Sequence, residues 1–210
     1  MSYDYVYKLI LAGSVGVGKT SLIQKITTSE FNPHTYTPTI GIEFCSTILN
    51  IHDKKIKCRI WDTAGQETYN SLINIYFRDI TGAILVFDSS KPESLEDICN
   101  IWIPQINKNN IIKKPKLILV ENKSDLKRNI NPKRLDDIIE SFDMLYIKTS
   151  VLHNTNTSGV LYKLCENIDK NTNYNNHDCL MNSHISPGYK NVSKPFEKQE
   201  KDRDYCCCIM

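Results

Sequence analysis

The sequence predicts an α/β fold built on a doubly wound, mostly parallel six-stranded sheet with one antiparallel edge strand. Short apolar runs alternate with stretches of helical periodicity, which is typical of strands and helices that alternate along a parallel sheet. The inner runs are apolar throughout, as expected of strands that helices cover on both faces. The predicted strands span residues 6–12, 42–51, 56–61, 82–88, 116–121 and 144–148.

Helical patterns fill the intervals between most of these strands. The runs at 42–51 and 56–61 are separated only by residues 52–55, which include Asp53, Lys54 and Lys55, so they must pair antiparallel, because a parallel crossover needs about a dozen residues. This predicts that one of the two is an antiparallel edge strand. The predicted helices span residues 18–28, 92–106, 132–142 and 159–169.

Composition divides the chain of 210 residues into one domain and a tail. Residues 1–170 carry the periodic patterns, whereas residues 171–210 show none and carry five basic and five acidic side chains, which predicts a flexible C-terminal tail. The formal net charge is +2 without a block of like charges, so composition predicts no nucleic-acid partner. The eight cysteines form no CxxC pair or disulfide framework, which favours a reduced, intracellular protein. No apolar run approaches the roughly 18 residues of a membrane-spanning helix.

Residues 13–20 match the phosphate-loop pattern G-x-x-x-x-G-K-[ST] between a predicted strand and a predicted helix. Backbone N–H groups of such a loop surround a β-phosphate, and the helix N-terminus adds a favourable partial charge. We expect Lys19 to bridge the β- and γ-phosphates and the Thr20 hydroxyl to bind Mg²⁺. The sequence therefore predicts a P-loop domain, with a nucleotide-phosphate site made by Ser14, Val15, Gly16, Val17, Gly18, Lys19, Thr20 and Ser21.

Two further segments narrow the choice among kinases, ATPases and GTPases. Asp62 follows a strand and can hold Mg²⁺ through water, Gly65 can offer its N–H to the γ-phosphate, and Gln66 can orient the attacking water as the catalytic residue. In Asn122-Lys123-Ser124-Asp125, the Asp125 carboxylate can accept hydrogen bonds from N1 and N2 of guanine, which adenine cannot supply. A small-molecule kinase would leave both segments unexplained.

The ordered set of motifs resembles the small GTPases of the Ras superfamily, and specifically the Rab type, over about residues 5–170. The Rab-like marks are residues 39–44, Trp61, residues 76–78 and residues 85–88. The resemblance implies that Thr39 coordinates Mg²⁺ and senses the γ-phosphate, and that Phe31 stacks near the guanine. It implies further base contacts at Ser150, Val151 and Leu152, and effector binding by Ile40, Gly41, Phe44, Trp61 and Tyr76.

The resemblance also implies a cellular role. It implies a monomeric GTPase that cycles between GTP and GDP, hydrolyses slowly, and recruits effectors in vesicle trafficking. The implied partners are an exchange factor, a GTPase-activating protein, a prenylation escort and a chaperone of the GDP-dissociation-inhibitor type. The implied location is the cytoplasmic face of vesicle, endosome or Golgi membranes, with a cytosolic pool, and residues 66–78 resemble the endosomal branch.

Several residues depart from the family pattern. Val15 stands where the family has glycine or a small polar residue, and its branched side chain is expected to crowd Gln66 or an activator. The alternative function is therefore a GTP-locked membrane scaffold with little hydrolysis. Val151 and Leu152 replace the usual Ala-Lys, and Glu121 replaces a glycine. We expect guanine specificity to survive these changes with weaker affinity.

The last residues suggest lipid attachment. Cys206, Cys207 and Cys208 precede Ile209 and Met210, and the final four residues fit C-a-a-X, with Met favouring a farnesyl group on Cys207. The Rab resemblance implies instead two geranylgeranyl groups, on Cys207 and Cys208. Both alternatives remain open on the sequence. The tail has equal numbers of positive and negative charges and no net basic patch, so we expect stable membrane anchoring to need two lipids.

Overall fold

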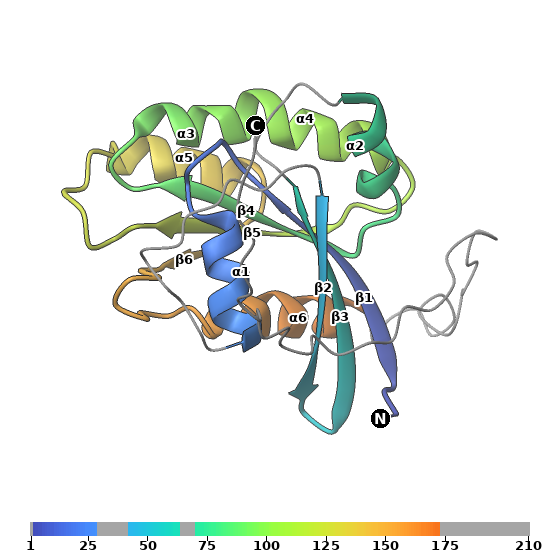
Figure 1. The fold of residues 1–210 in the computed structure, drawn as a ribbon. Coiled ribbons are helices and arrows are strands. Elements are labelled where there is room, and N and C mark those ends of the chain that lie inside the picture. The colour runs from blue at the N-terminus through green and yellow to red at the C-terminus, as the bar shows by residue number, and fades with distance from the viewer. Residues whose placement is uncertain (1, 29–41, 64–69, 173–210) are drawn as a thin grey trace, which may run out of the picture.

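The computed structural model of the chain describes residues 2–28, 42–63 and 70–172. A six-stranded sheet in the order β2-β3-β1-β4-β5-β6 forms its centre (Figure 1). Neighbouring strands are parallel except β2 and β3, which pair antiparallel at the edge, so the predicted fold class is confirmed. The strands are β1 (Tyr5–Ala12), β2 (Ile42–Ile51), β3 (Lys54–Thr63), β4 (Gly82–Asp88), β5 (Lys116–Asn122) and β6 (Leu145–Lys148).

The β2–β3 hairpin is tighter than the sequence predicts. The two strands pair along their whole lengths, from Ile42 opposite Thr63 to Ile51 opposite Lys54. Only His52 and Asp53 connect them, and His52 has a φ of 52°, a left-handed conformation that suits tight turns. β3 therefore begins two residues earlier than the predicted strand.

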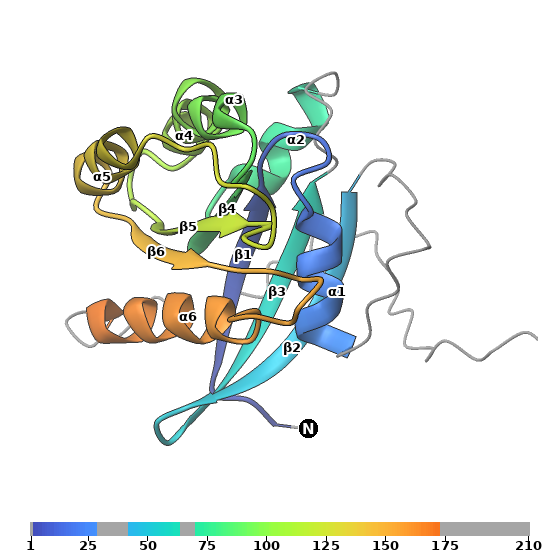
Figure 2. The same cartoon turned by 90° about the vertical axis from the view of Figure 1, so that its left-hand side faces the viewer.

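Helices cover both faces of the sheet and create two cores (Figures 1 and 2). In β4, Ile84 and Val86 face one core, while Leu85 and Phe87 face the other, as the side-chain alternation of a strand requires. This explains why the inner strands are apolar throughout. The first core is covered by α1 (Lys19–Thr28) and α6 (Gly159–Thr172), the second by α2 (Asn70–Phe77), α3 (Pro92–Asp97), α4 (Ile103–Asn109) and α5 (Pro132–Ser141).

Two helical features differ from the sequence predictions. No helix was predicted at α2, which packs Phe77 and Tyr76 against the second core. The single helix predicted for residues 92–106 is instead α3 and α4, joined by a π-helical turn, η2 (Ile98–Trp102). Pro104 in the first turn of α4 has no N–H to donate to the preceding turn, and the N–H of Ile103 donates to the carbonyl of Ile98 five residues back.

No helix within residues 2–28, 42–63 and 70–172 combines the length and the apolarity needed to cross a membrane.

Candidate functional site

The sequence motifs converge at the edge of the sheet where the parallel strands end. The loop after β1 leads into α1, and the loops after β5 and β6 lie next to it (Figure 2). Ligands of open α/β sheets bind outside the carboxyl ends of the strands. The predicted phosphate loop and the two predicted base-binding segments therefore lie together at the carboxyl ends of the parallel strands.

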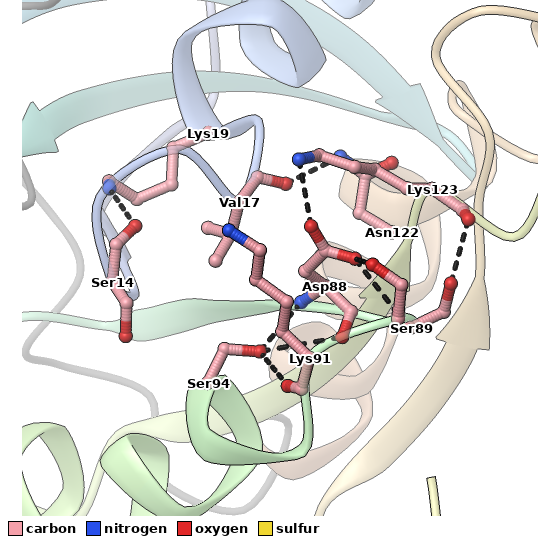
Figure 3. Close-up of polar contacts among 10 residues, drawn as sticks. Ser14, Val17, Lys19, Asp88, Ser89, Lys91, Ser94, Asn122 and Lys123 are labelled. Carbon is pink, nitrogen blue, oxygen red and sulfur yellow. Dashed lines mark hydrogen bonds and ion pairs between the residues drawn. The ribbon is translucent and has the colours of Figure 1, made fainter. Parts of the chain in front are cut away.

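Lys19 folds back over the phosphate loop. Its Nζ donates a hydrogen bond to the carbonyl oxygen of Gly13 at 2.8 Å. It donates a second one to the carbonyl oxygen of Ser14 at 3.0 Å (Figure 3). Burial lowers the pKa of Lys19 to about 8, although the nearby Asp62 carboxylate opposes the shift. The loop thus holds a buried ammonium group, and a negative charge next to it, such as the Asp62 carboxylate, favours its protonated form.

Thr20 and Asp62 form the candidate metal site. The Thr20 hydroxyl donates to Asp62 Oδ2 at 2.6 Å. Asp62 is 1% exposed, and its Oδ1 is buried without a hydrogen-bond partner in the described structure. Burial raises the pKa of Asp62 to about 6, against the effects of Thr20 and Lys19. A hydroxyl beside an unsatisfied carboxylate oxygen suits a hard cation, so these residues fit Mg²⁺.

Gly13 has no space for a side chain. Its φ is +147°, and a Cβ at this position would lie 2.1 Å from the carbonyl oxygen of Val86. The close approach brings the start of the phosphate loop against the end of β4. Gly16 is the useful contrast, because its φ is +75° but a Cβ there would meet nothing within 4 Å.

We therefore expect Gly13→Ala to destabilise the protein by about 2 kcal/mol more than Gly16→Ala, since the backbone of β4 must move to admit the methyl group. Thermal and denaturant unfolding of the two variants would measure the difference. Equal stabilities would show that the loop and β4 separate easily.

Asn122 links the phosphate loop to the segment that follows β6. Its Nδ2 donates to the carbonyl of Val17 at 2.9 Å, and its Oδ1 accepts from the Thr149 hydroxyl at 3.0 Å. Asn122 and Thr149 are both buried. The side chain of Asn122 is thus engaged with protein groups and holds three loops in register.

Lys123 forms an ion pair with the buried Asp88 at the end of β4, with 2.8 Å between Nζ and Oδ2 (Figure 3). Burial alone would raise the pKa of Asp88, but hydrogen bonds from Lys123 and Ser90 hold it below its usual value. Lys123 adopts a left-handed backbone with φ of 57°. Its carbonyl oxygen accepts a hydrogen bond from the hydroxyl of Ser89 at 2.7 Å.

Asp125 and Ser150 lie side by side. The Ser150 hydroxyl donates to Oδ1 of Asp125, and the N–H of Ser124 donates to the carbonyl of Thr149 at 3.1 Å. Val151 is buried, whereas Leu152 is 56% exposed. The structure therefore brings the two predicted base-binding segments together.

Other predicted nucleotide-site residues have different environments. The Ser14 hydroxyl donates to Asp97 of α3 at 2.6 Å, Val15 is 56% exposed, and Ser21 is half-buried in the first turn of α1. Eight predicted residues lie outside the part of the chain that the structure describes: Phe31, Thr39, Ile40, Gly41, Gly65, Gln66, Cys207 and Cys208.

The predicted effector residues fall into two groups. Phe44 and Trp61 lie opposite each other in the β2–β3 ladder, and their rings meet edge to face with centroids 5.0 Å apart. Phe44 is 56% exposed, and the Lys8 ammonium lies 5.5 Å from the Trp61 ring. Tyr76 comes from α2 and packs partly against the second core.

The residues that support the site are not among those that the sequence predicts. Asp88, Ser89 and Thr149 all follow or end buried strands at the same edge, and each bonds to the Asn122–Lys123 pair. Their position was the available signal, because a polar residue at the carboxyl end of a buried strand lies where ligands bind. In the sequence Glu121 stands out only as a departure from the family pattern, whereas in the structure its buried carboxylate pairs with the half-buried Arg128.

Comparison with known proteins identifies the family. A family model described as "Ras family" matches residues 8–170. The chain is 36% identical to Ras-related protein Rab-11A of Dictyostelium discoideum over 156 residues, covering 73% of this chain and 72% of that protein. It is 35% identical to Ras-related protein RABA1c of Arabidopsis thaliana over 171 residues, covering 79% and 76%. It is 32% identical to Ras-related protein Rab-8B of Pongo abelii over 211 residues, covering 100% and 98%.

The match extends over most of the domain, and it includes the segments that meet at the edge of the sheet. The chain therefore belongs to the Ras family and is a small GTPase of the Rab type, an enzyme that hydrolyses GTP to GDP.

Proposed function

We propose that this GTPase is a switch of intracellular vesicle trafficking that recruits effectors to the cytoplasmic face of a vesicle, endosome or Golgi membrane while GTP is bound. The observation that supports this best is the meeting of the phosphate loop, Asp62 and the segments around Asn122 and Ser150 at one edge of the sheet. The similarity to Rab-11A and Rab-8B supports a Rab-type role.

The phosphate loop would bind the β- and γ-phosphates through its N–H groups and Lys19. Thr20 and Thr39 would hold Mg²⁺ directly and Asp62 would hold it through water, and the bound ion would neutralise phosphate charge. The buried, unpartnered oxygen of Asp62 supports this assignment. Gln66 would orient the attacking water in the hydrolysis step.

Asp125 would select guanine by accepting hydrogen bonds from N1 and N2 of the base. Ser150 positions this carboxylate, and the N–H of Val151 is assigned to the guanine O6. Phe31 would stack near the base, with Leu152 beside it. Asn122 contributes by joining the base segments to the phosphate loop.

The switch itself would be a change of order in two segments. The γ-phosphate and Mg²⁺ would hold Thr39 and Gly65, and hydrolysis would release both. The edge-to-face pair of Phe44 and Trp61 lies next to these segments in the chain and, with Tyr76, Ile40 and Gly41, is assigned to effector binding. An exchange factor and a GTPase-activating protein would drive the cycle, acting on a monomer.

Membrane attachment is assigned to the C-terminal tail. Lipids on Cys207 and Cys208, as farnesyl or geranylgeranyl groups, would anchor the chain, and an escort and a chaperone of the GDP-dissociation-inhibitor type would carry it through the cytosol. Intact mass of the protein isolated from cells would count and identify the attached lipids. An unmodified tail would refute this part of the proposal.

Single-turnover hydrolysis tests the switch. The protein loaded with GTP should convert it to GDP at a rate on the order of 10⁻⁴–10⁻³ s⁻¹ without an activator, and Gln66→Leu should slow conversion about tenfold or more because the water loses its orienting group. Chromatography of the nucleotide at timed intervals measures both rates. Unchanged hydrolysis in Gln66→Leu would remove Gln66 from its assigned role.

Val15→Gly decides between the two forms of the proposal. Val15 is the exposed branched residue of the phosphate loop, and its removal should accelerate hydrolysis if the side chain crowds the attacking water or an activator residue. Slow wild-type hydrolysis restored by Val15→Gly alone would favour the GTP-locked scaffold. Equal rates would favour a cycling switch with a harmless valine.

A further inference from the structure

Glu121 is a buried carboxylate in the residue of β5 directly before Asn122. It is 1% exposed. Along β5, Val120 belongs to the first core and Leu119 to the second, so alternation places Glu121 on the face of the sheet that α3, α4 and α5 cover. Its side chain thus lies on the opposite face from Asn122, which bonds to the phosphate loop.

Two side chains satisfy this carboxylate. Arg128 donates from Nε to Oε1 at 2.8 Å and from Nη2 to Oε2 at 3.1 Å, and the Tyr146 hydroxyl donates to Oε2 at 2.5 Å. Burial alone would raise the pKa of Glu121, but these hydrogen bonds hold it below its usual value. Glu121 is therefore an ionised, two-sided anchor within the protein.

The anchor joins both segments that the proposed base site needs. Residues 124–127, which include Asp125, are all exposed, and the chain returns to the sheet at Arg128 and at Asn129, whose N–H donates to the carbonyl of Ser89 at 2.9 Å. Tyr146 lies on β6, which runs directly into Thr149 and Ser150. Glu121 thus ties the exit of the Asp125 segment to the strand that leads into the Ser150 segment.

We propose that Glu121, with Arg128 and Tyr146, is a positioning residue that fixes the Asp125 carboxylate for recognition of the guanine 2-amino edge. The proposal rests on the proposed guanine-nucleotide binding. The segment that carries Asp125 would be fixed at its start by Asn122 and Ser150 and at its end by Arg128. Loosening the second end leaves the phosphate loop intact but lets the carboxylate drift from the base.

Arg128→Gln tests the proposal on the full chain with purified nucleotides. We expect release of a fluorescent GDP to accelerate about tenfold, because a buried charge loses its bidentate partner and the segment detaches. The decisive measurement is the ratio of the dissociation constants of inosine diphosphate and GDP. Inosine lacks the 2-amino group, so this ratio should fall at least about threefold in Arg128→Gln.

The matched control is Arg134→Gln. Arg134 also pairs in bidentate fashion, with Glu96 at 2.8 and 2.7 Å, but both side chains are exposed and join α5 to α3. The Arg134→Gln substitution removes the same charge and the same kind of hydrogen bond. It should leave the ratio of the inosine diphosphate and GDP dissociation constants unchanged. Tyr146→Phe removes one hydroxyl from the anchor and should lower the ratio in the same direction by a smaller factor.

Three results would overturn the inference. The first is an unchanged ratio in Arg128→Gln with faster release of both nucleotides, which is what a purely structural role produces. The second is an equal fall in Arg134→Gln. If Arg128→Gln does not fold, an unchanged ratio in Tyr146→Phe is the third. A wild-type chain that bound GDP no better than ADP would instead refute the proposed function.

Discussion

Asp125→Ala should weaken GDP binding about 10³-fold while changing ADP binding by less than about threefold. The carboxylate is expected to accept two hydrogen bonds from guanine, and bonds to a charged group contribute about 1.5–3 kcal/mol each. Adenine has neither donor at these positions, so ADP makes no hydrogen bond that the substitution removes and its affinity should change little. Competition of each nucleotide against a fluorescent GDP analogue measures the four dissociation constants.

Asp136→Ala is the control for this loss of charge. Asp136 is exposed on α5 and should leave both affinities unchanged. A variant at Asp125 that still preferred GDP to ADP by its original factor would show that the base is selected elsewhere. The Ser150 hydroxyl also loses its acceptor in Asp125→Ala, so Ser150→Ala would measure the part of the effect due to positioning.

Lys19→Met should weaken GDP and GTP about 10²–10³-fold and leave the preference for guanine over adenine unchanged. The ammonium is expected to contact phosphate oxygens, where charge-assisted hydrogen bonds are strong. This pattern is the reverse of that for Asp125→Ala, which alters base selection. The two variants together separate the phosphate half of the site from the base half.

The affinity of the wild-type chain should also depend on pH through Lys19. Its pKa is about 8 in the structure, because burial disfavours the ammonium, and a bound phosphate would raise it. Above pH 8 the free protein must therefore take up a proton to bind, so affinity falls up to about tenfold per pH unit, whereas below pH 8 it is flat. Titrations from pH 6.5 to 9.5 should show this slope in the wild type and lose it in Lys19→Met.

The sheet could be predicted because burial on both faces leaves a plain signal. Residues 83–87 of β4 and 117–120 of β5 are apolar residue after residue, as a strand between two layers of helices requires. α2 has no clear sequence signal, because eight residues are too few to show a helical period; the packing of Phe77 on the second core supports this helix instead. The break near Pro104 does have a sequence signal, because a proline interrupts the helical pattern that precedes it.

The site was predictable only where a motif is contiguous. The phosphate loop and the Asn122–Asp125 segment are read from neighbouring residues, whereas Asp88 and Lys123 are 35 positions apart and meet only across parallel strands. Glu121 could be recognised as unusual but not as paired. Its partners Arg128 and Tyr146 come from a loop and from another strand.

The bonds of Asn122 have a mechanical consequence for nucleotide exchange. One amide group holds the carbonyl of Val17 at one end and the hydroxyl of Thr149 at the other. A partner that pulled the segment after β6 outward would load both bonds in series and transmit the strain to the phosphate loop. The proposed contacts to the base and to the phosphates would then weaken together. A partner that displaced either the phosphate loop or the segment after β6 would therefore release the whole nucleotide.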